Sequence, residues 1–190
     1  MAGKNNRTHP TIPPGVDEND FSYDEMNQSR KMMQMPVPKM YVDTSAIGGV
    51  FDDESLAFGC KPFFDLVMKK KFQILVSNMT YQELSRAPGY VMALIDGLAS
   101  DVRIFCTVTD EVKNLAQSYI DFGVLTEKSI NDAIHVATAT VYHADCIVSC
   151  NFRHMVNRTK IAQFNEVNRR QGYGMIDIKR PEEVIDYGDN

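Results

Sequence analysis

The hydrophobic positions of the chain follow two different patterns, and the change comes near residue 39. From Met40 onward, short apolar runs alternate with longer stretches in which apolar residues recur at helical spacing. The short runs predict five strands, at 40–42, 72–76, 102–108, 146–149 and 175–178. The longer stretches predict helices at 54–70, 80–100, 110–121 and 126–143, the last capped by Thr126.

The predicted strands are apolar throughout, which is typical of strands buried on both faces of a parallel sheet. Strands that alternate with helices predict an α/β fold, and we expect a three-layer α/β/α sandwich around a parallel sheet of about five strands. The 190 residues, 44% of them hydrophobic, suffice for one domain. We assign this domain to residues 39–190, with a short polar tail after Ile178 where Pro181 stops the last strand.

Residues 1–38 lack sustained periodicity and carry five prolines and an acidic cluster. We interpret them as an extension outside the core, flexible or partly helical, in which only 23–35 favours a helix. Two roles stay open for it: a disordered tail, or a segment that lies over an acidic crevice through Arg30 and Lys31.

The net charge of −5, from 25 acidic and 20 basic residues, gives no general attraction to a phosphate backbone. Contact with nucleic acid must therefore be local or bridged by a metal. No apolar stretch is long enough to span a membrane, and the polar N-terminus precedes no apolar segment of a signal peptide. Four irregularly spaced cysteines in apolar surroundings predict reduced thiols. We therefore expect a cytoplasmic protein with no membrane contact.

Three acidic residues stand where a site is expected. Asp43 follows the first strand, at the end of a parallel sheet where ligands bind, although an ordinary helix N-cap explains it equally well. Glu83 follows the second strand within reach of the same crevice, and its alternative is a solvated helical residue. Asp132 lies in an alanine-rich, closely packed helix and needs a partner, either a metal or a hydrogen bond from Ser129 or Lys128.

Three carboxylates that converge on one crevice repel one another, and a divalent cation with oxygen ligands relieves that repulsion. Mg²⁺ or Mn²⁺ fits best. Such an ion activates water and stabilises the charge that develops when a phosphodiester is cleaved. The sequence therefore predicts a metal site at Asp43, Glu83 and Asp132 with hydrolytic activity on nucleic acid.

Four segments together resemble the PIN-domain family, from about Met40 to Ile178. They are Tyr41-Val42-Asp43-Thr44-Ser45, the Glu83 segment, Asn131-Asp132-Ala133-Ile134-His135-Val136-Ala137, and Asp145-Cys146-Ile147-Val148-Ser149 with Asn151-Phe152-Arg153-His154. Within the family the chain is most similar to VapC-like toxins of toxin–antitoxin modules. That resemblance implies an Mg²⁺-dependent endoribonuclease with RNA as substrate, a cognate antitoxin as partner and a homodimer.

The resemblance also assigns roles to individual residues. Asp43, Glu83 and Asp132 match the three principal acids, and Thr44 or Ser45 matches a hydroxyl that orients the first of them. Asn151 departs from the pattern, because many members place a fourth Asp there, so both one and two metals stay open. Arg153 and His154 are weaker candidates for contact with substrate phosphates or an antitoxin.

Other interpretations stay open at this point. A non-catalytic PIN-like module that binds RNA or a protein accommodates Asn151 and the negative charge. A phosphoacceptor or phosphatase domain is disfavoured because Ser45 stands where a second Asp is needed. A zinc site from His143, Cys146, Cys150 and His154 lacks standard finger spacing. Asp145 precedes its strand, so we place it at the opposite end of the sheet and outside the metal set, and we interpret His135 as a hydrogen-bonded interior residue.

Overall fold

The computed structural model describes residues 36–52 and 59–188. Residues 1–35 of the predicted extension, with its helix, lie outside the described residues, as does the start of the helix predicted at 54–70. Within the described part, no helix is both long and apolar enough to cross a membrane.

The described strands form one sheet of five parallel strands in the order β3-β2-β1-β4-β5. Their bounds are β1 (Lys39–Val42), β2 (Gln73–Ser77), β3 (Arg103–Cys106), β4 (Cys146–Val148) and β5 (Ile178–Lys179). Strand β1 is central: its Met40 pairs with Ile74 of β2 on one side and with Cys146 of β4 on the other. All five predicted strands are found. The third and fourth are shorter than expected, and the fifth overlaps its predicted range only at Ile178.

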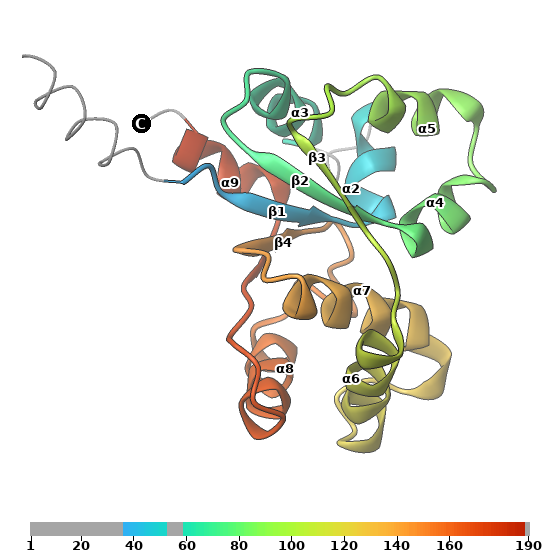
Figure 1. Ribbon diagram of the computed structural model, residues 1–190, viewed down its shortest axis with the longest axis vertical. Helices are drawn as coiled ribbons and strands as arrows, with labels where there is room; N and C mark the ends of the chain where they lie inside the picture. The colour runs from blue at the N-terminus through green and yellow to red at the C-terminus, as the bar shows by residue number, and fades with distance from the viewer. Residues whose placement is uncertain (1–35, 53–58, 189–190) are drawn as a thin grey trace, which may run out of the picture. The chain divides into compact units, whose positions relative to one another are not determined.

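Helices cover both faces of this sheet (Figure 1). One face carries α2 (Thr44–Gly48), α3 (Cys60–Met68), α4 (Asn78–Leu84), α5 (Gly89–Asp96) and α9 (Pro181–Gly188). The other carries α6 (Asp110–Asp121), α7 (Ile130–Val141) and α8 (Arg158–Arg170). Two short 3-10 turns, η1 (Gly49–Phe51) and η3 (Glu127–Ser129), follow α2 and precede α7.

The strands build two hydrophobic cores because successive side chains point to opposite faces. In β1, Met40 and Val42 pack with α3 and α5, whereas Tyr41 packs with α6 and α7. In β4, Cys146 and Val148 alternate with Ile147 in the same way. The predicted α/β/α sandwich with a parallel sheet is therefore confirmed.

Four local predictions were wrong, each for a physical reason. Thr126 does not cap α7, because the 3-10 turn η3 stands between them and Thr126 makes no side-chain cap bond. The single helix expected at 80–100 is two helices, because Pro88 lacks an N–H donor and starts α5 as its N-cap. The last strand ends before Pro181, as predicted, but the short polar tail expected after it is helix α9, since the fixed φ of proline suits the first position of a helix. Helix α8 was missed entirely; it has few apolar residues, and Phe164 and Val167 bury only a narrow edge.

Candidate functional site

The site lies between β1 and β4, where the order of strands reverses. The chain leaves β1 toward β2 on one side of the sheet, and leaves β4 toward β5 on the other. Such a switch point opens a crevice at the carboxyl ends of the two strands. Asp43 follows β1 directly and Ser149 follows β4 directly, so the topology alone brings these residues to the same crevice.

Asp43 is almost completely buried, with 3% of its surface exposed, and it is held by three hydrogen bonds. Its Oδ1 accepts bonds from the Ala46 backbone N–H at 3.1 Å and the Ser45 hydroxyl at 2.7 Å. Its Oδ2 accepts a bond from the Ser149 hydroxyl at 2.7 Å. Asp43 is thus the N-cap of α2, as one alternative held, and it also lines the crevice. Sequence reasoning missed Ser149.

Ser45 connects the two strand ends, because its hydroxyl donates to Asp43 and accepts a bond from the Cys150 backbone N–H at 2.9 Å. The two hydroxyls for which an orienting role was predicted, those of Thr44 and Ser45, therefore bond to different acids. Ser45 fixes Asp43, whereas the Thr44 hydroxyl donates to Glu83 Oε2 at 2.7 Å.

Glu83 of α4 is bound by three donors and forms an ion pair. Besides Thr44, it accepts a bond from Asn131 Nδ2 at 3.2 Å on Oε1, and His135 Nε2 lies 3.1 Å from Oε2. Burial raises the pKa of Glu83, but the bond and the charge of His135 outweigh burial and hold the pKa at about 2. The carboxylate is therefore charged and already has a positive partner, so it is not the freely solvated residue of the alternative interpretation.

His135 of α7 is the buried centre of this network, with 3% of its surface exposed. Its Nδ1 lies 2.8 Å from the Tyr41 hydroxyl, which in turn lies 2.9 Å from the Ser77 hydroxyl. Burial lowers the pKa of His135, but the Tyr41 hydroxyl and the nearby carboxylates raise it to about 10. A pKa raised in this way favours the imidazolium, in which both ring nitrogens are donors. The predicted hydrogen-bonded interior histidine is confirmed, with Glu83 as its partner.

Asp132 at the start of α7 is bonded to the loop after β4, since Asn151 Nδ2 donates to its Oδ1 at 2.9 Å. Burial raises the pKa of Asp132, and the charge of Asp43 adds to that effect. His154 and His135 act in the opposite direction without reversing it. Among the described residues Asp132 forms no ion pair, in contrast to Glu83. Its bonds come from Asn151 and from Ser129, the latter being one of the predicted partners.

The two weaker candidates, Arg153 and His154, lie in different surroundings. The His154 Nδ1 lies 3.3 Å from the Ser129 hydroxyl, and its charge acts on Asp132, so His154 borders the site. Arg153 is exposed on the same loop. Asp145 accepts a bond from the Lys39 backbone N–H at 2.7 Å, where β1 and β4 begin, which confirms its place at the opposite end of the sheet.

Comparison with known proteins decides the family. The model of the PIN domain matches residues 40–159, which include all three acids and Asn151. The chain belongs to the PIN-domain family. No curated protein matches it in sequence. Among solved structures, the toxin VapC20 of Mycobacterium tuberculosis, described as cleaving the sarcin-ricin loop, matches with a TM-score of 0.44 and 20% identity, over 57% of this chain and 86% of VapC20.

PIN domains are typically nucleases and generally depend on metal ions. The carboxylates of Asp43, Glu83 and Asp132 supply the oxygen donors that Mg²⁺ prefers. In residues 36–52 and 59–188, however, no three His, Cys, Asp or Glu side chains are grouped so as to hold one metal ion. Mg²⁺ usually binds only one or two carboxylates and keeps several waters. Asp43 and Asp132, of which the second forms no ion pair among the described residues, fit that mode of binding.

The zinc site considered from His143, Cys146, Cys150 and His154 is not formed within the described residues, because no three such side chains are grouped there. Cys146 is buried within strand β4, and the Cys150 sulfur lies 3.4 Å from the sulfur of Cys60. The cysteines of this PIN domain are free thiols, as the sequence predicted.

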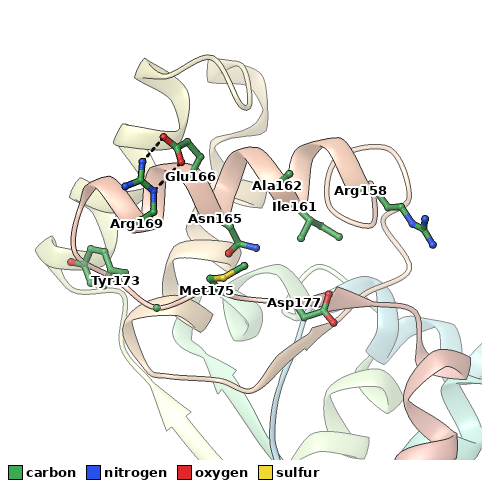
Figure 2. A pocket seen from close by; sticks show the side chains of 10 residues that line it. Arg158, Ile161, Ala162, Asn165, Glu166, Arg169, Tyr173, Met175 and Asp177 are labelled. Atoms are coloured by element: carbon green, nitrogen blue, oxygen red, sulfur yellow. Dashed lines mark hydrogen bonds and ion pairs between the residues drawn. The ribbon is translucent and has the colours of Figure 1, made fainter.

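A separate cavity of about 630 Å³ lies between α8 and the segment that leads into β5 (Figure 2). Asn165 of α8 clamps this segment through two bonds to the backbone of Ile176, and Arg169 is paired with Glu166 at 3.0 Å. Figure 2 shows Ile161 and Asn165 on the side of α8 that faces Met175 and Asp177. Neither Asp43, Glu83 nor Asp132 lines this cavity, so it does not belong to the carboxylate site.

Proposed function

We propose that this PIN domain is an endoribonuclease that hydrolyses RNA phosphodiester bonds with Mg²⁺ or Mn²⁺, and that it acts as a VapC-like toxin. The observation that carries the proposal is the pair of bonds that cross the switch point. Ser149 holds Asp43, and Asn151 holds Asp132, so the loop after β4 orients the carboxylates contributed by β1 and α7. The fixed orientation of acidic groups is what metal-assisted hydrolysis requires of a protein.

Asp43, Asp132 and Glu83 are the residues that would hold the ion. Among the bonds of the described residues, Asp43 uses three of the about four acceptor positions of a carboxylate, and one position on Oδ2 is left. The chemistry that a divalent cation supplies when bound there is neutralisation of the phosphate charge and activation of water. The protein's own contribution is orientation: Ser45 and Ser149 fix Asp43, and the His135 imidazolium fixes Glu83.

The resemblance to VapC-like toxins supports three further parts of the proposal, namely a cognate antitoxin, a homodimer and a cytoplasmic location. Thr44, Ser45 and Asn151 would line the site, and Arg153 and His154 would contact the substrate's phosphates. We retain 39–190 as the nuclease domain and 1–38 as its extension.

A cleavage assay on total cellular RNA tests the activity. We expect the wild type to cleave in Mg²⁺ and to stop in EDTA, and Asp132→Asn to lose at least about 10²-fold in rate. Asp145→Asn is the matched control, because it removes the same charge at the opposite end of the sheet and keeps an oxygen for the Lys39 N–H. Equal rates for the wild type and Asp132→Asn would refute the assignment.

A catalytically inactive PIN module that binds RNA or a protein is the second candidate. Asn151 favours it, because the amide replaces an acid and occupies one acceptor position of Asp132. Retention of RNA by the wild type without any metal-dependent cleavage would establish this candidate instead.

A further inference from the structure

A cavity of about 530 Å³ opens directly beside the carboxylate site, between the α2–η1 segment and helices α4 and α5. Thr44 and Glu83 line it, and the 2.7 Å bond between their side chains joins its two walls. A substrate phosphate bound beside Glu83 would bring a neighbouring nucleotide to this cavity. Its volume lies within the range of about 300–1,000 Å³ that is usual for small-ligand sites.

Two exposed aromatic rings line the same cavity. Phe51 of η1 is 42% exposed and Tyr90 of α5 is 57% exposed, and their ring centroids lie 4.8 Å apart in an edge-to-face arrangement. Neither ring belongs to the two hydrophobic cores of the domain. Exposed aromatic rings are the usual stacking platforms for the bases of single-stranded RNA.

The charges around the cavity select a base rather than a phosphate. The charged residues that line it are Asp52 and Glu83, and no lysine or arginine is among its described lining residues. Two carboxylates repel a phosphate but accept hydrogen bonds from the exocyclic amino groups of bases. Glu83 is already bonded to three donors, whereas no side-chain hydrogen bond of Asp52 is found among the described residues, so Asp52 is the carboxylate with acceptors to offer.

We propose that this cavity is a nucleobase-binding subsite, in which Phe51 and Tyr90 stack a base next to the scissile phosphate and Asp52 favours a base with an exocyclic amino group. The inference rests on the proposed nuclease function, since it takes RNA as the occupant. It adds a determinant of sequence preference: adenine, cytosine and guanine carry such an amino group, and uracil does not.

The test measures binding, not cleavage, so that its outcome does not depend on catalysis. Short fluorescein-labelled single-stranded RNA homopolymers of A, C and U are titrated with full-length Asp132→Asn protein, with fluorescence anisotropy as the readout. We expect tighter binding of A and C than of U. Adding Phe51→Ala and Tyr90→Ala together should weaken binding of A and C by about 5- to 100-fold, as expected for the loss of one stacked base.

Phe122→Ala is the matched control, because Phe122 is 50% exposed and lies outside the cavity, where Arg170 covers its ring. Asp52→Asn should reduce the preference for A and C over U while leaving the stacking contribution. Circular dichroism and thermal denaturation show that each variant is folded. Unchanged affinity of the folded double variant, or an equal loss in Phe122→Ala, would overturn the subsite.

The failure of this subsite and of the nuclease proposal are distinguishable. If the wild type does not cleave RNA, yet binds A and C through Phe51 and Tyr90, the subsite is supported and the nuclease proposal is refuted. If the wild type cleaves in Mg²⁺ and the double variant retains the wild-type KM, the nuclease proposal is supported and the subsite is refuted. The cavity is then available to a protein segment.

Discussion

His135 Nε2 lies 3.1 Å from Glu83 Oε2, and the pair connects the two halves of the site, α7 and α4. The histidine side chain is 4% exposed and the glutamate side chain 23% exposed, so the pair is shielded from screening by salt. The bond that Tyr41 makes to the second ring nitrogen places the imidazolium over the central strand. The pair therefore belongs as much to the stability of the domain as to its site.

The His135–Glu83 pair predicts how stability depends on pH. The folded pKa of His135 is raised to about 10, above its value of about 6.5 in an unfolded chain. Between these values the folded protein keeps a proton that the unfolded chain releases, so the free energy of unfolding must fall as pH rises. The contribution of His135 is complete below about pH 6.5.

Urea denaturation of the metal-free protein in EDTA, between about pH 6.5 and 7.5, checks this prediction below the range where free thiols titrate. The wild type should lose stability across this window, and His135→Gln should lose much less. The comparison concerns the slopes, because the variant is also less stable at every pH. Parallel slopes would contradict the raised pKa of His135.

Removal of the Ser45 hydroxyl tests the connection between the two strand ends. Ser45→Ala loses the bond to Asp43 and leaves the Cys150 N–H without its acceptor. We expect a loss of about 1–3 kcal/mol in the free energy of unfolding, which is the cost of an unsatisfied buried polar group. RNA cleavage should fall as well, since Asp43 is less well oriented.

Ser85→Ala is a suitable control for Ser45→Ala, because Ser85 is exposed and bonds only to its own helix through the Gln82 carbonyl. Its stability and cleavage rate should remain those of the wild type. If Ser45→Ala behaves like this control in both measurements, the connection through Ser45 contributes neither to stability nor to cleavage.

The sequence predicted the sheet and the three acids because both depend on local patterns. Apolar runs identify buried strands, and a carboxylate placed just after such a run reaches the carboxyl edge of the sheet whatever the details of packing. The same reasoning placed Asp145 at the opposite edge. Helix α8 was not predicted, because charged and amide residues outnumber its apolar positions Ile161, Phe164 and Val167. Asn157, which precedes it, is nevertheless a residue type that commonly caps a helix.

The contacts within the site could not be predicted, because they join residues that are distant in sequence. Asn151 and Asp132 are separated by 19 positions, and His135 and Glu83 by 52. Phe51 and Tyr90 likewise meet only through the packing of η1 against α5. The sequence predicted three acids at one edge of the sheet, but not which of them has a cationic partner, and that difference separates Glu83 from Asp132.

This difference predicts unequal roles in metal binding. Because His135 already balances its charge, Glu83 should contribute less to the affinity for Mn²⁺ than Asp132 does. In isothermal titration, Glu83→Gln should weaken Mn²⁺ binding by about 10- to 100-fold, as substitutions around a metal site usually do. Asp132→Asn should abolish detectable binding. The reverse ranking would make Glu83 the principal ligand.

The substitution Asn151→Asp tests whether the amide at position 151, which departs from the family pattern, limits metal binding at the site. The variant replaces the 2.9 Å bond from Asn151 to Asp132 by repulsion between two carboxylates. Without metal, we expect the free energy of unfolding to fall by about 1–3 kcal/mol. With Mn²⁺ the added carboxylate becomes a ligand, so Tm should rise more in the variant than in the wild type.

Asn157→Asp separates this effect from a general effect of charge. It adds the same charge six residues further along the chain, at the N-cap of α8, where an aspartate can accept the bonds from Thr159 and Lys160 that Asn157 accepts. Mn²⁺ should stabilise this control no more than the wild type. If Mn²⁺ raises Tm equally in both variants, the ion responds to net charge alone. A rise confined to Asn151→Asp, with faster RNA cleavage, would mean that the amide at position 151 weakens a metal site that the rest of the crevice is built to hold.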